Sequence, residues 1–486
     1  MTAKFFSVYS RKFPCFVSLV FSLFFVLSLE GLANPTHQTL VLNPDCHKDA
    51  SLDPMTKNAD SEITVTAWNL LNLFDTKHDI ENKKDKNDWQ YNGASVRINK
   101  KLGYVSGPIT KYKGCLKALD KGLNRCKKSR QEKSCVTREK RYFQGCVESN
   151  WGQETLNKKL NALVAGMETF FEAKALPDIL LVSEVENKDI LSEFAVKAGF
   201  YKKLSPKFPA LKGNCKTNPY KNIHLSTSPD ERGIDVGVLI NPQNKNIEAI
   251  SCYEHKANTG GDRPTRNILE LELMIDKKHR LFIYANHWPS QAGPTKLRVN
   301  VAKTLKSIIQ KRMKKHPDSH FVAGGDFNVT SSDNKPSRPI DDVLEKELGL
   351  VDLWTTTDSK GSYYYPPKLD WSELDRFVVS KNLMDQNGLD VSDKSFTVHN
   401  HPSLTRSKRI TFYRDMKTIQ KRKKQGEKIY YDNLYTDLDH GELNKKFLQN
   451  PKLESVEVIE KCAPNRFSNS GKGFSDHFAI SMKLSF

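Results

Sequence analysis

The chain has 486 residues, enough for one large domain or two to three ordinary ones. Hydrophobic residues make up 38%, which suffices for a core, whereas a mean hydropathy of -0.59 excludes a protein that crosses a membrane several times. The formal net charge of +19 favours polyanionic partners such as nucleic acid, anionic lipid or polyphosphate. A basic exported protein without such a partner would carry the same charge.

The amino terminus has the order of a secretory signal. Basic residues precede an apolar run over 13–29, and small residues follow at 31 and 33, the -3 and -1 positions of a cleavage site. We therefore expect residues 1–33 to be a signal peptide and residues 34–60 to be a polar leader. The mature protein would then be secreted or periplasmic, with no stable membrane insertion. A retained membrane anchor is the alternative, although the apolar run is short for a stable span.

The cysteine pattern predicts disulfide bonds. Eight cysteines follow the signal, an even number that fits four disulfides in an exported chain. Within a polar insertion over about 77–150, Cys115, Cys126, Cys135 and Cys146 are 11, 9 and 11 residues apart. This symmetric spacing predicts a helical hairpin closed by Cys115–Cys146 and Cys126–Cys135. A four-cysteine zinc site is the alternative, but no pair has the short spacing of zinc modules. For the other four cysteines we predict Cys215–Cys252 and Cys46–Cys462.

Strands and helices alternate along the chain. Strands are predicted over 63–69, 178–184, 234–240, 268–274, 281–286, 320–326, 374–379 and 478–486, and helices over 156–171 and 297–313. This order predicts an α/β or α+β protein with two packed sheets flanked by helices. The chain has no internal repeat. We expect one catalytic domain over 61–486, decorated by the four-cysteine insertion and by a basic insertion over about 404–455.

Polar residues stand at or beside the ends of these apolar runs, where a core would not place them. They are Asn69, Glu184, His287, Asp326, Asn328, Asp375, Asp476 and His477. One such residue is usually a cap or a turn former. Because strand ends converge at the rim of a sheet, however, eight of them predict one acidic site with two histidines. Carboxylate and amide oxygens suit a hard divalent cation, and two histidines can divide the proton transfers of phosphodiester hydrolysis.

Six segments, in the same order, resemble motifs of the endonuclease/exonuclease/phosphatase superfamily. They are Trp68–Asn69, Val182–Glu184, Asn286–Ser290, Gly324–Asn328, Leu374–Phe377 and Gly473–His477. The resemblance is to the exported bacterial-type nuclease branch. It implies a deoxyribonuclease I-like four-layer sandwich, in which two mixed β-sheets pack face to face with helices outside. It also implies a hydrolase of phosphoric esters that depends on Mg²⁺ or Mn²⁺, with Ca²⁺ as a structural ion.

The resemblance implies catalytic and metal-binding roles for the matching residues. Glu184, Asn69, Asp476 and Asp326 would bind the metal ion. His477 would be the general base oriented by Asp375, His287 the general acid, and Asp326 with Asn328 the pair that positions the nucleophile.

Substrate contacts are implied for Asn69 and Asn328, and for Arg266, which resembles an arginine that binds phosphate. Asp235 resembles the carboxylate that pairs with His287. The alternatives are a turn residue for Asp235 and a surface ion pair for Arg266, with Arg232 and Arg263 as substitutes in the phosphate role.

The basic insertion bears on the choice of substrate. Over 406–424 it carries nine lysine and arginine residues interleaved with Phe412 and Tyr413. This composition suits a nucleic-acid track, in which cations meet phosphates and rings stack on bases, unless the segment is a solvated loop. We therefore expect a monomeric, non-specific nuclease that acts on nucleic acid, with DNA favoured over RNA. The alternatives are a sphingomyelinase-like or inositol-phosphate phosphoesterase, a phosphatase for small phosphomonoesters, and an inactive binding module.

Overall fold

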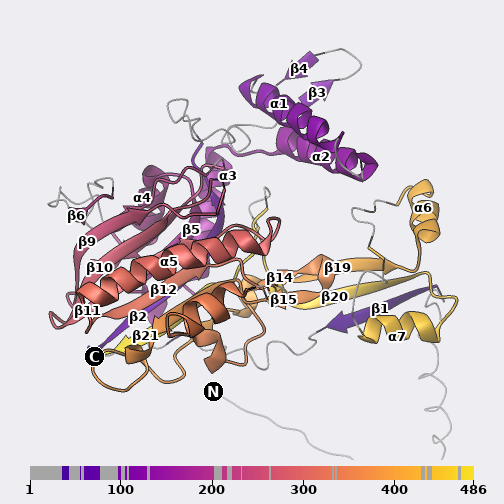
Figure 1. Cartoon of the computed structure of the whole chain (residues 1–486). Helices are drawn as coiled ribbons and strands as arrows, with labels where there is room; N and C mark the ends of the chain where they lie inside the picture. Colours follow the sequence, from indigo (N-terminus) through magenta and orange to yellow (C-terminus); the bar gives the residue numbers. More distant parts are fainter. Residues whose placement is uncertain are drawn as a thin grey trace, which may run out of the picture. The chain divides into compact units, whose positions relative to one another are not determined.

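The computed structural model describes residues 36–42, 55, 60–76, 97–99, 104–106, 109–127, 132–201, 211–215, 222–230, 232–261, 264–330, 333, 337–427, 429, 433–434, 441–468 and 472–486. The chain divides into two compact units (Figure 1). The smaller combines Met1–Val41 with Arg409–Ile459, and the larger combines Leu42–Lys408 with Glu460–Phe486.

The larger unit contains a first seven-stranded sheet in the order β17-β21-β2-β5-β8-β7, with β18 also paired to β21. The strands are β2 (Glu62–Leu73), β5 (Ile179–Val185), β7 (Ile223–Leu225), β8 (Asp235–Ile240), β17 (Asp390–Val391), β18 (Thr397–Val398) and β21 (Ile480–Ser485). Strand β5 is buried over its whole length, as its continuous apolar run predicts.

A second seven-stranded sheet has the order β13-β16-β12-β11-β10-β9-β6. Its strands are β6 (Lys212–Gly213), β9 (Ile247–His255), β10 (Ile268–Ile275), β11 (His279–His287), β12 (His320–Asp326), β13 (Leu350–Asp352) and β16 (Asp375–Ser380). Strands β12 and β16 pack against β2, and β11 packs against β5 and β8. The two sheets therefore lie face to face around a shared apolar core.

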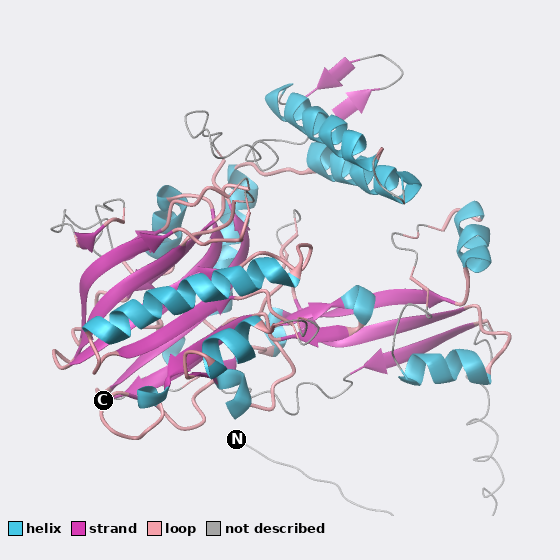
Figure 2. Ribbon diagram, in the orientation of Figure 1, coloured by secondary structure: helices cyan, strands magenta, loops and turns pink. Residues whose placement is uncertain are grey.

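Helices cover the outer faces of both sheets (Figure 2). Helices α3 (Gln153–Met167) and α4 (Lys188–Lys197) pack on the first sheet. Helix α5 (Thr295–Lys315) and the π-helix η3 (Pro339–Lys346) pack on the second, where Leu305 joins a cluster with Phe282 and Phe321. The structure thus confirms the predicted four-layer sandwich. Short elements complete this unit: β3 (Arg97–Asn99), β4 (Tyr104–Ser106), η2 (Glu172–Lys174), η4 (Leu353–Thr356), β14 (Tyr363–Tyr365), η5 (Pro366–Lys368), β15 (Asp370–Ser372), η6 (Lys381–Leu383) and η7 (Pro402–Leu404).

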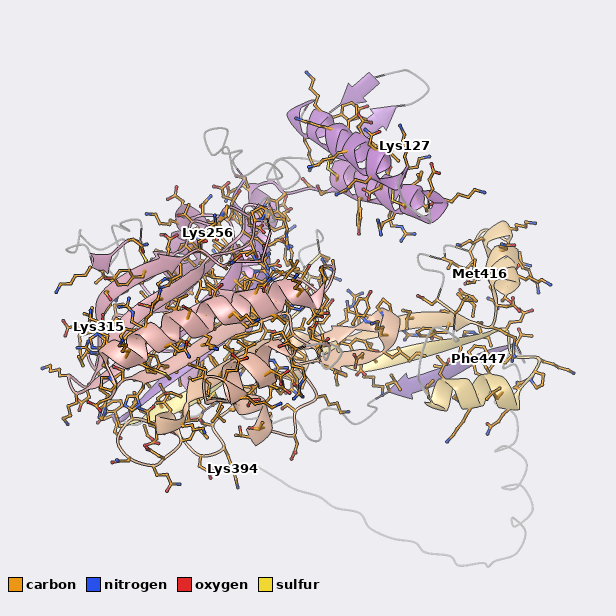
Figure 3. The ribbon with its side chains drawn as sticks, viewed as in Figure 1. Lys127, Lys256, Lys315, Lys394, Met416 and Phe447 are labelled. Carbon is orange, nitrogen blue, oxygen red and sulfur yellow. A yellow bond between two sulfur atoms is a disulfide. The ribbon has the colours of Figure 1, made fainter. Side chains whose placement is uncertain are left out.

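The smaller unit is built on a three-stranded sheet in the order β1-β20-β19. Its elements are β1 (His37–Leu42), β19 (Thr405–Tyr413), α6 (Met416–Lys424), α7 (Gly441–Gln449) and β20 (Ser455–Pro464). Phe412 and Tyr413 are only 1% and 3% exposed, and Ile419 and Phe447 of the same unit are buried as well. The guanidinium of Arg414 lies 5.3 Å from the centre of the Phe447 ring and donates to three backbone carbonyls. Phe447 is labelled in Figure 3.

These contacts correct two predictions. Phe412 and Tyr413 cannot stack on bases as predicted, because their rings are buried. The segment over 404–455 is also more than a decoration of one domain, since most of it folds with its own core into a separate compact unit. Part of the predicted polar leader, residues 37–42, is the strand β1 of the same sheet.

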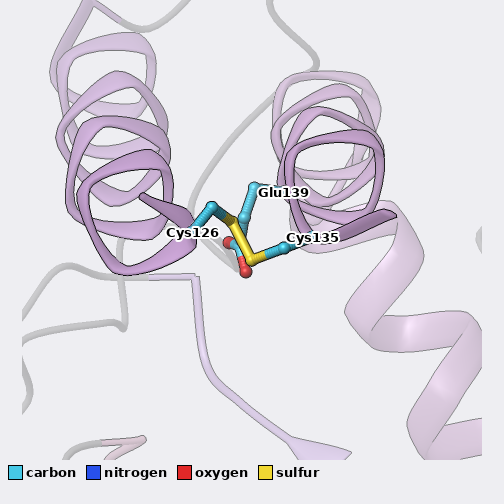
Figure 4. Close-up of side chains that lie close together, drawn as sticks. All are labelled: Cys126, Cys135 and Glu139. Atoms are coloured by element: carbon cyan, nitrogen blue, oxygen red, sulfur yellow. A yellow bond between two sulfur atoms is a disulfide. The ribbon is translucent and has the colours of Figure 1, made fainter. Parts of the chain in front are cut away.

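The four-cysteine insertion is a helical hairpin, as predicted. Helices α1 (Ile109–Cys126) and α2 (Glu132–Glu148) are joined by the disulfides Cys115–Cys146 and Cys126–Cys135. Figure 4 shows the second disulfide beside Glu139. A zinc site is excluded, because sulfurs bonded to each other are not thiolate ligands.

The remaining cysteines fall in the larger unit. The predicted bond Cys215–Cys252 is confirmed. Cys462 is disulfide-bonded, but its predicted partner Cys46 lies outside the described residues. Within the described part of the chain, no helix has the length and apolar character needed to cross a bilayer.

Reduction of the disulfides is expected to lower the melting temperature. The bonds Cys115–Cys146 and Cys215–Cys252 close loops of 31 and 37 residues, and loops of this size correspond to about 4 kcal/mol of stabilisation each. Calorimetry with and without a phosphine reductant measures the effect. An unchanged melting temperature, together with eight titratable thiols in the untreated mature protein, would contradict the pairing.

Candidate active site

The predicted polar residues meet at one edge of the two sheets. Strands β2 and β5 run parallel, as do β11 and β12, so their carboxyl ends lie at the same edge. Strands β8, β16 and β21 run antiparallel to these neighbours, and their amino ends lie there too. In the second sheet, His287, Asp326 and Asp375 stand opposite one another on three adjacent strands.

Local backbone features aim these side chains. A Cβ atom on Gly324 would lie 2.6 Å from a methyl group of Leu181, so glycine allows β12 to approach the other sheet. Strand β5 has a register shift at Glu184, whose φ is +63°. Asn328 also has a positive φ, of +51°. Non-glycine residues rarely adopt this conformation, and strained residues and bulges cluster at functional sites.

One hydrogen bond links the two sheets inside the site. Asn69 Nδ2 donates to Asp326 Oδ2 at 3.0 Å, while Asn69 Oδ1 accepts from the Leu71 backbone at 2.9 Å. The other Asp326 oxygen accepts from the Asn328 backbone at 2.9 Å. Burial raises the pKa of Asp326, although the charge of His477 opposes the rise. The two hydrogen bonds, one to each oxygen, hold the Asp326 side chain in place between the sheets.

His477 and Asp375 form a buried pair. His477 Nδ1 lies 2.7 Å from Asp375 Oδ2, which also accepts from Ser362 Oγ at 2.6 Å. Burial alone would lower the pKa of His477, but the carboxylates of Asp375 and Asp326 raise it to about 10. With Nδ1 engaged by Asp375, Nε2 is left as the ring atom that can exchange a proton with a ligand.

His287 stands between two carboxylates. Its Nε2 lies 3.6 Å from Asp326 Oδ2 and 3.9 Å from Glu184 Oε1. Burial, together with the charges of Arg266 and Arg232, holds the pKa of His287 well below its usual value. Its Nδ1 is buried and has no hydrogen-bond partner among the described residues.

The structure does not join Asp235 to His287. Asp235 Oδ1 instead accepts from Ser226 Oγ at 3.1 Å and from the Ser228 backbone at 2.8 Å. Burial raises the pKa of this carboxyl to about 7. Asp235 therefore fixes the chain over 226–228, a role that its position at a strand end did not distinguish from pairing with His287.

Arg266 and Arg232 have different surroundings. Arg266 is buried and donates to the carbonyls of His287, at 3.0 Å, and of Trp288, and it pairs with Asp230 at 3.2 Å. Its guanidinium therefore supports the strand end that carries His287. Arg232 is the arginine that lines the pocket, and it contacts Glu184 at 3.2 Å. Arg263 lies outside the described residues.

A pocket of about 520 Å³ collects the site. Of the eight predicted residues at strand ends, seven line it: Asn69, Glu184, His287, Asp326, Asn328, Asp476 and His477. The eighth, Asp375, lies behind His477. The sequence prediction missed further lining residues, among them Gln291, Tyr363, Tyr365 and Lys368. Three of these come from the β14–β15 hairpin and η5, whose run of three tyrosines was the available signal.

The oxygen atoms in this pocket fit a hard divalent cation. Glu184 and Asp476 both line the pocket, with the Asn69 amide and the Asp326 carboxylate beside them. Carboxylate and amide oxygens are the donors that Mg²⁺ and Mn²⁺ prefer. Ligand atoms of Asp326, Asp375 and His477 also lie within 4.8 Å of one another. The residues that would hold the ion are therefore Glu184 and Asp476, with Asn69 and Asp326.

A buried lysine lies beneath this pocket and was not predicted. Lys159 of α3 is 0% exposed, and its Nζ donates to the Phe474 carbonyl at 2.7 Å. Burial lowers the pKa of Lys159 to about 7, against the opposing effect of Asp476 and Glu184. Phe474 precedes Asp476 and His477 by two and three residues, so Lys159 fixes the backbone that leads into the site.

Comparisons with known proteins agree with the motifs. A model of the endonuclease/exonuclease/phosphatase family matches residues 134–431. No curated protein sequence matches the chain. Among solved structures, truncated Caenorhabditis elegans TDP2 is similar at 14% identity and a TM-score of 0.38, covering 69% of this chain and 93% of its own.

Two further solved structures are similar. The mannosyl-6-phosphatase of Bacteroides thetaiotaomicron has 13% identity and a TM-score of 0.36, covering 68% of this chain and 91% of its own. The human Nocturnin catalytic domain with bound sulfate has 11% identity and a TM-score of 0.36, covering 88% of this chain and 96% of its own.

Proposed function

Because this chain belongs to the endonuclease/exonuclease/phosphatase family, we propose that it is an exported, divalent-metal-dependent phosphodiesterase that cleaves nucleic acid internally, with DNA as its main substrate. One observation carries the proposal: a single pocket gathers two histidines, four acidic residues and two asparagines, with Asp375 hydrogen-bonded to His477. This set supplies a base, an acid and a cation site, which phosphodiester hydrolysis requires.

Each group has a proposed task. His477 Nε2 would take the proton from the attacking water while Asp375 holds the ring through Nδ1. A divalent ion held by Glu184 and Asp476 would neutralise charge on the phosphate. Because the ion would also compete for the carboxylates around His477, it would lower the affinity of the His477 ring for a proton.

Other residues of the pocket would act on the substrate. His287 would protonate the leaving oxygen, because the negative charge of a bound phosphate would raise the pKa of the ring, which burial and the two arginines otherwise hold low. Asp326 would position the water between the two sheets. Asn69 and Asn328 would contact the phosphate. Arg232, which lines the pocket, replaces Arg266 as the proposed phosphate contact because its fork can bind two phosphate oxygens.

Nucleic acid is the proposed substrate class for two reasons. The chain carries +19 formal charge, and the pocket wall adds Lys368 and two tyrosines to Arg232. Cations meet phosphates, and a tyrosine ring at a pocket mouth, such as the 42% exposed Tyr365, can stack on an unpaired base. Export is supported by the amino-terminal pattern and by the disulfides, which form in oxidising compartments.

Replacement of Glu184 by glutamine is expected to reduce Mg²⁺-dependent plasmid cleavage by at least about 10²-fold, because a charged metal ligand is lost. The purified mature chain is incubated with plasmid DNA, RNA and sphingomyelin, with Mg²⁺ or with EDTA. Glu193→Gln, on the exposed face of α4, removes the same charge away from the pocket and should behave as wild type. Turnover of sphingomyelin without cleavage of DNA would replace nucleic acid with lipid as the substrate.

A further inference from the structure

Four basic residues form a line along helix α1. Lys113, Lys117, Lys121 and Arg125 follow one another at intervals of four residues, and all four are exposed. Residues four apart lie one above the other on a helix, so the line extends over roughly 18 Å at 1.5 Å per residue. We call these four residues the α1 stripe. None of them lines the pocket described above.

The α1 stripe has few partners of opposite charge. Among the described residues, no ion pair is formed by Lys113, Lys117 or Lys121, and Arg125 approaches Glu139 only at 3.9 Å. The first turn of α1 also contains no acidic residue. Like charges four residues apart repel one another and destabilise a helix. The α1 stripe therefore weakens its helix instead of supporting it.

The hairpin keeps its structure by other means. The disulfides Cys115–Cys146 and Cys126–Cys135 join α1 to α2 at two places along the helices. The ring centres of Tyr112 on α1 and Phe143 on α2 are 6.5 Å apart. Covalent cross-links can maintain a helix pair that repulsion would otherwise loosen. The α1 stripe opposes folding, and the disulfides hold the hairpin together in spite of it. A ligand that neutralises these positive charges would explain why the stripe is present.

The whole hairpin has the same bias. Among the described residues of the hairpin, the exposed cations are Lys113, Lys117, Lys121, Arg125, Lys127, Lys133, Arg138, Lys140 and Arg141, and the exposed acids are Asp120, Glu132 and Glu148. Figure 3 shows Lys127 on this hairpin. Such a ligand would therefore be a polyanion. A straight row of positive charges matches a polyanion whose negative charges also follow one another along a line.

We propose that the α1 stripe is a docking surface for the sugar–phosphate backbone of nucleic acid, which holds long substrates independently of their sequence. Each strand of duplex DNA presents one phosphate per about 3.4 Å of the helix axis, so a stripe of this length would span about five phosphates of one strand. This inference rests on the proposed function for its substrate class.

The alternative ligand, an anionic membrane, fits the hairpin less well. A helix that lies on a membrane buries an apolar face among the lipids. The apolar side of α1 is occupied by α2, since Cys115 and Cys126 are 1% and 0% exposed. The large apolar side chains exposed on the described hairpin are Leu116, at 37%, and Tyr142, at 63%. Two isolated side chains do not make a membrane-binding face.

The test replaces all four stripe residues by glutamine, which keeps helix propensity and removes the charges. The matched control is Lys303→Gln with Lys311→Gln, Lys314→Gln and Lys315→Gln, four exposed positions on α5 that lower the net charge equally. Both variants are made in the full, oxidised mature chain. Binding to a 30-base-pair duplex is measured in EDTA over a series of salt concentrations, and cleavage is measured on plasmid and on bis(4-nitrophenyl) phosphate.

The stripe variant should reduce the slope of log K against log salt by about 3 to 4, since each neutralised phosphate contributes about 0.9. Its KM for plasmid should rise at least tenfold more than its KM for the small diester. Its melting temperature should stay the same or rise, because repulsion is removed. The α5 variant should change the salt slope by less than about 1.

Three results would overturn the inference. Equal effects of the two variants would mean that only net charge matters. A fall in melting temperature of the stripe variant would indicate a structural role. Loss of binding to phosphatidylserine vesicles without loss of duplex binding would assign the stripe to membranes. Failure of the proposed function looks different, since the wild-type chain would then bind the duplex through the stripe but cleave neither DNA nor RNA.

Discussion

Replacement of His477 by alanine is expected to reduce the kcat for plasmid cleavage by about 10³- to 10⁴-fold, the range associated with a general base and its orienting carboxylate. His477 lines the pocket, its Nδ1 is bound by Asp375 at 2.7 Å, and its Nε2 is the remaining ring nitrogen. Asp375→Asn should give a loss within the same range. It keeps a side chain of the same size but removes the charge that orients and stabilises the protonated ring.

A measurement of metal binding distinguishes the loss of a general base from the loss of the cation site. Isothermal titration with Mn²⁺ should give His477→Ala an affinity close to that of wild type, whereas Glu184→Gln should bind the ion at least about tenfold more weakly. His401→Ala serves as the matched control, because His401 contacts Ser403 outside the pocket. A His477→Ala variant that retained a tenth of the wild-type kcat would refute the assignment of the base.

The sequence predicts the sandwich because its core strands are unambiguous patterns. The runs that became β5 and β12 are apolar almost throughout, and each ends in a carboxylate. A strand that is buried on both faces in a two-sheet core must be apolar. The carboxylate follows where the strand reaches the edge of the sheet and the apolar core ends. Pairing order and chain direction then bring these ends together, which is why seven of the eight predicted residues share a pocket.

Long-range partners account for what the sequence could not predict. Asp235 stands at a strand end like the others, but its hydrogen bonds go to Ser226 and Ser228. Arg266 has the residue type of a phosphate ligand, but its guanidinium already pairs with Asp230 and donates to two backbone carbonyls. Composition reveals which groups are polar. It does not reveal which of them already have partners inside the fold.

The same limit explains the basic insertion. Phe412 and Tyr413 stand among lysine and arginine residues, and this composition is the same for a base-stacking track and for a small folded unit. The structure distinguishes the two, since both rings are buried, as is Phe447 of the same unit. Other buried residues of this unit, such as Leu443 of α7 and Val456 of β20, stand about 30 to 45 positions further along the chain. A local pattern cannot contain that information.

Lys159→Met is expected to raise the melting temperature and lower the activity, two effects of opposite sign. Burial lowers the pKa of Lys159 from 10.5 to about 7, a difference that corresponds to a penalty of about 5 kcal/mol for the buried charge. Loss of the hydrogen bond to the Phe474 carbonyl offsets about 1–3 kcal/mol of that gain. The free energy of unfolding should therefore rise at pH 6 in the variant.

The pH dependence gives this prediction its sign. Between pH 7 and 10.5 the unfolded chain keeps the lysine proton that the folded chain has released, so the stability of the wild type increases with pH across this window. Below pH 7 both states are protonated and the full penalty is present. The advantage of Lys159→Met should therefore be largest at pH 6 and should shrink toward pH 10. Thermal unfolding at the two pH values measures it.

Activity should move the other way, because methionine cannot hold the Phe474 carbonyl. Asp476 and His477 follow within three residues, and small displacements of catalytic groups reduce rates by up to about 10²-fold. Lys158→Met is the matched control, since Lys158 is 46% exposed and forms its ion pair with the exposed Glu154. Its stability should change by less than about 0.5 kcal/mol. A lower melting temperature for Lys159→Met at both pH values would contradict the buried-charge penalty. Unchanged kcat would show that the lysine does not position the loop. Opposite shifts would mean that a lysine unfavourable for folding is retained because it holds the backbone of the site.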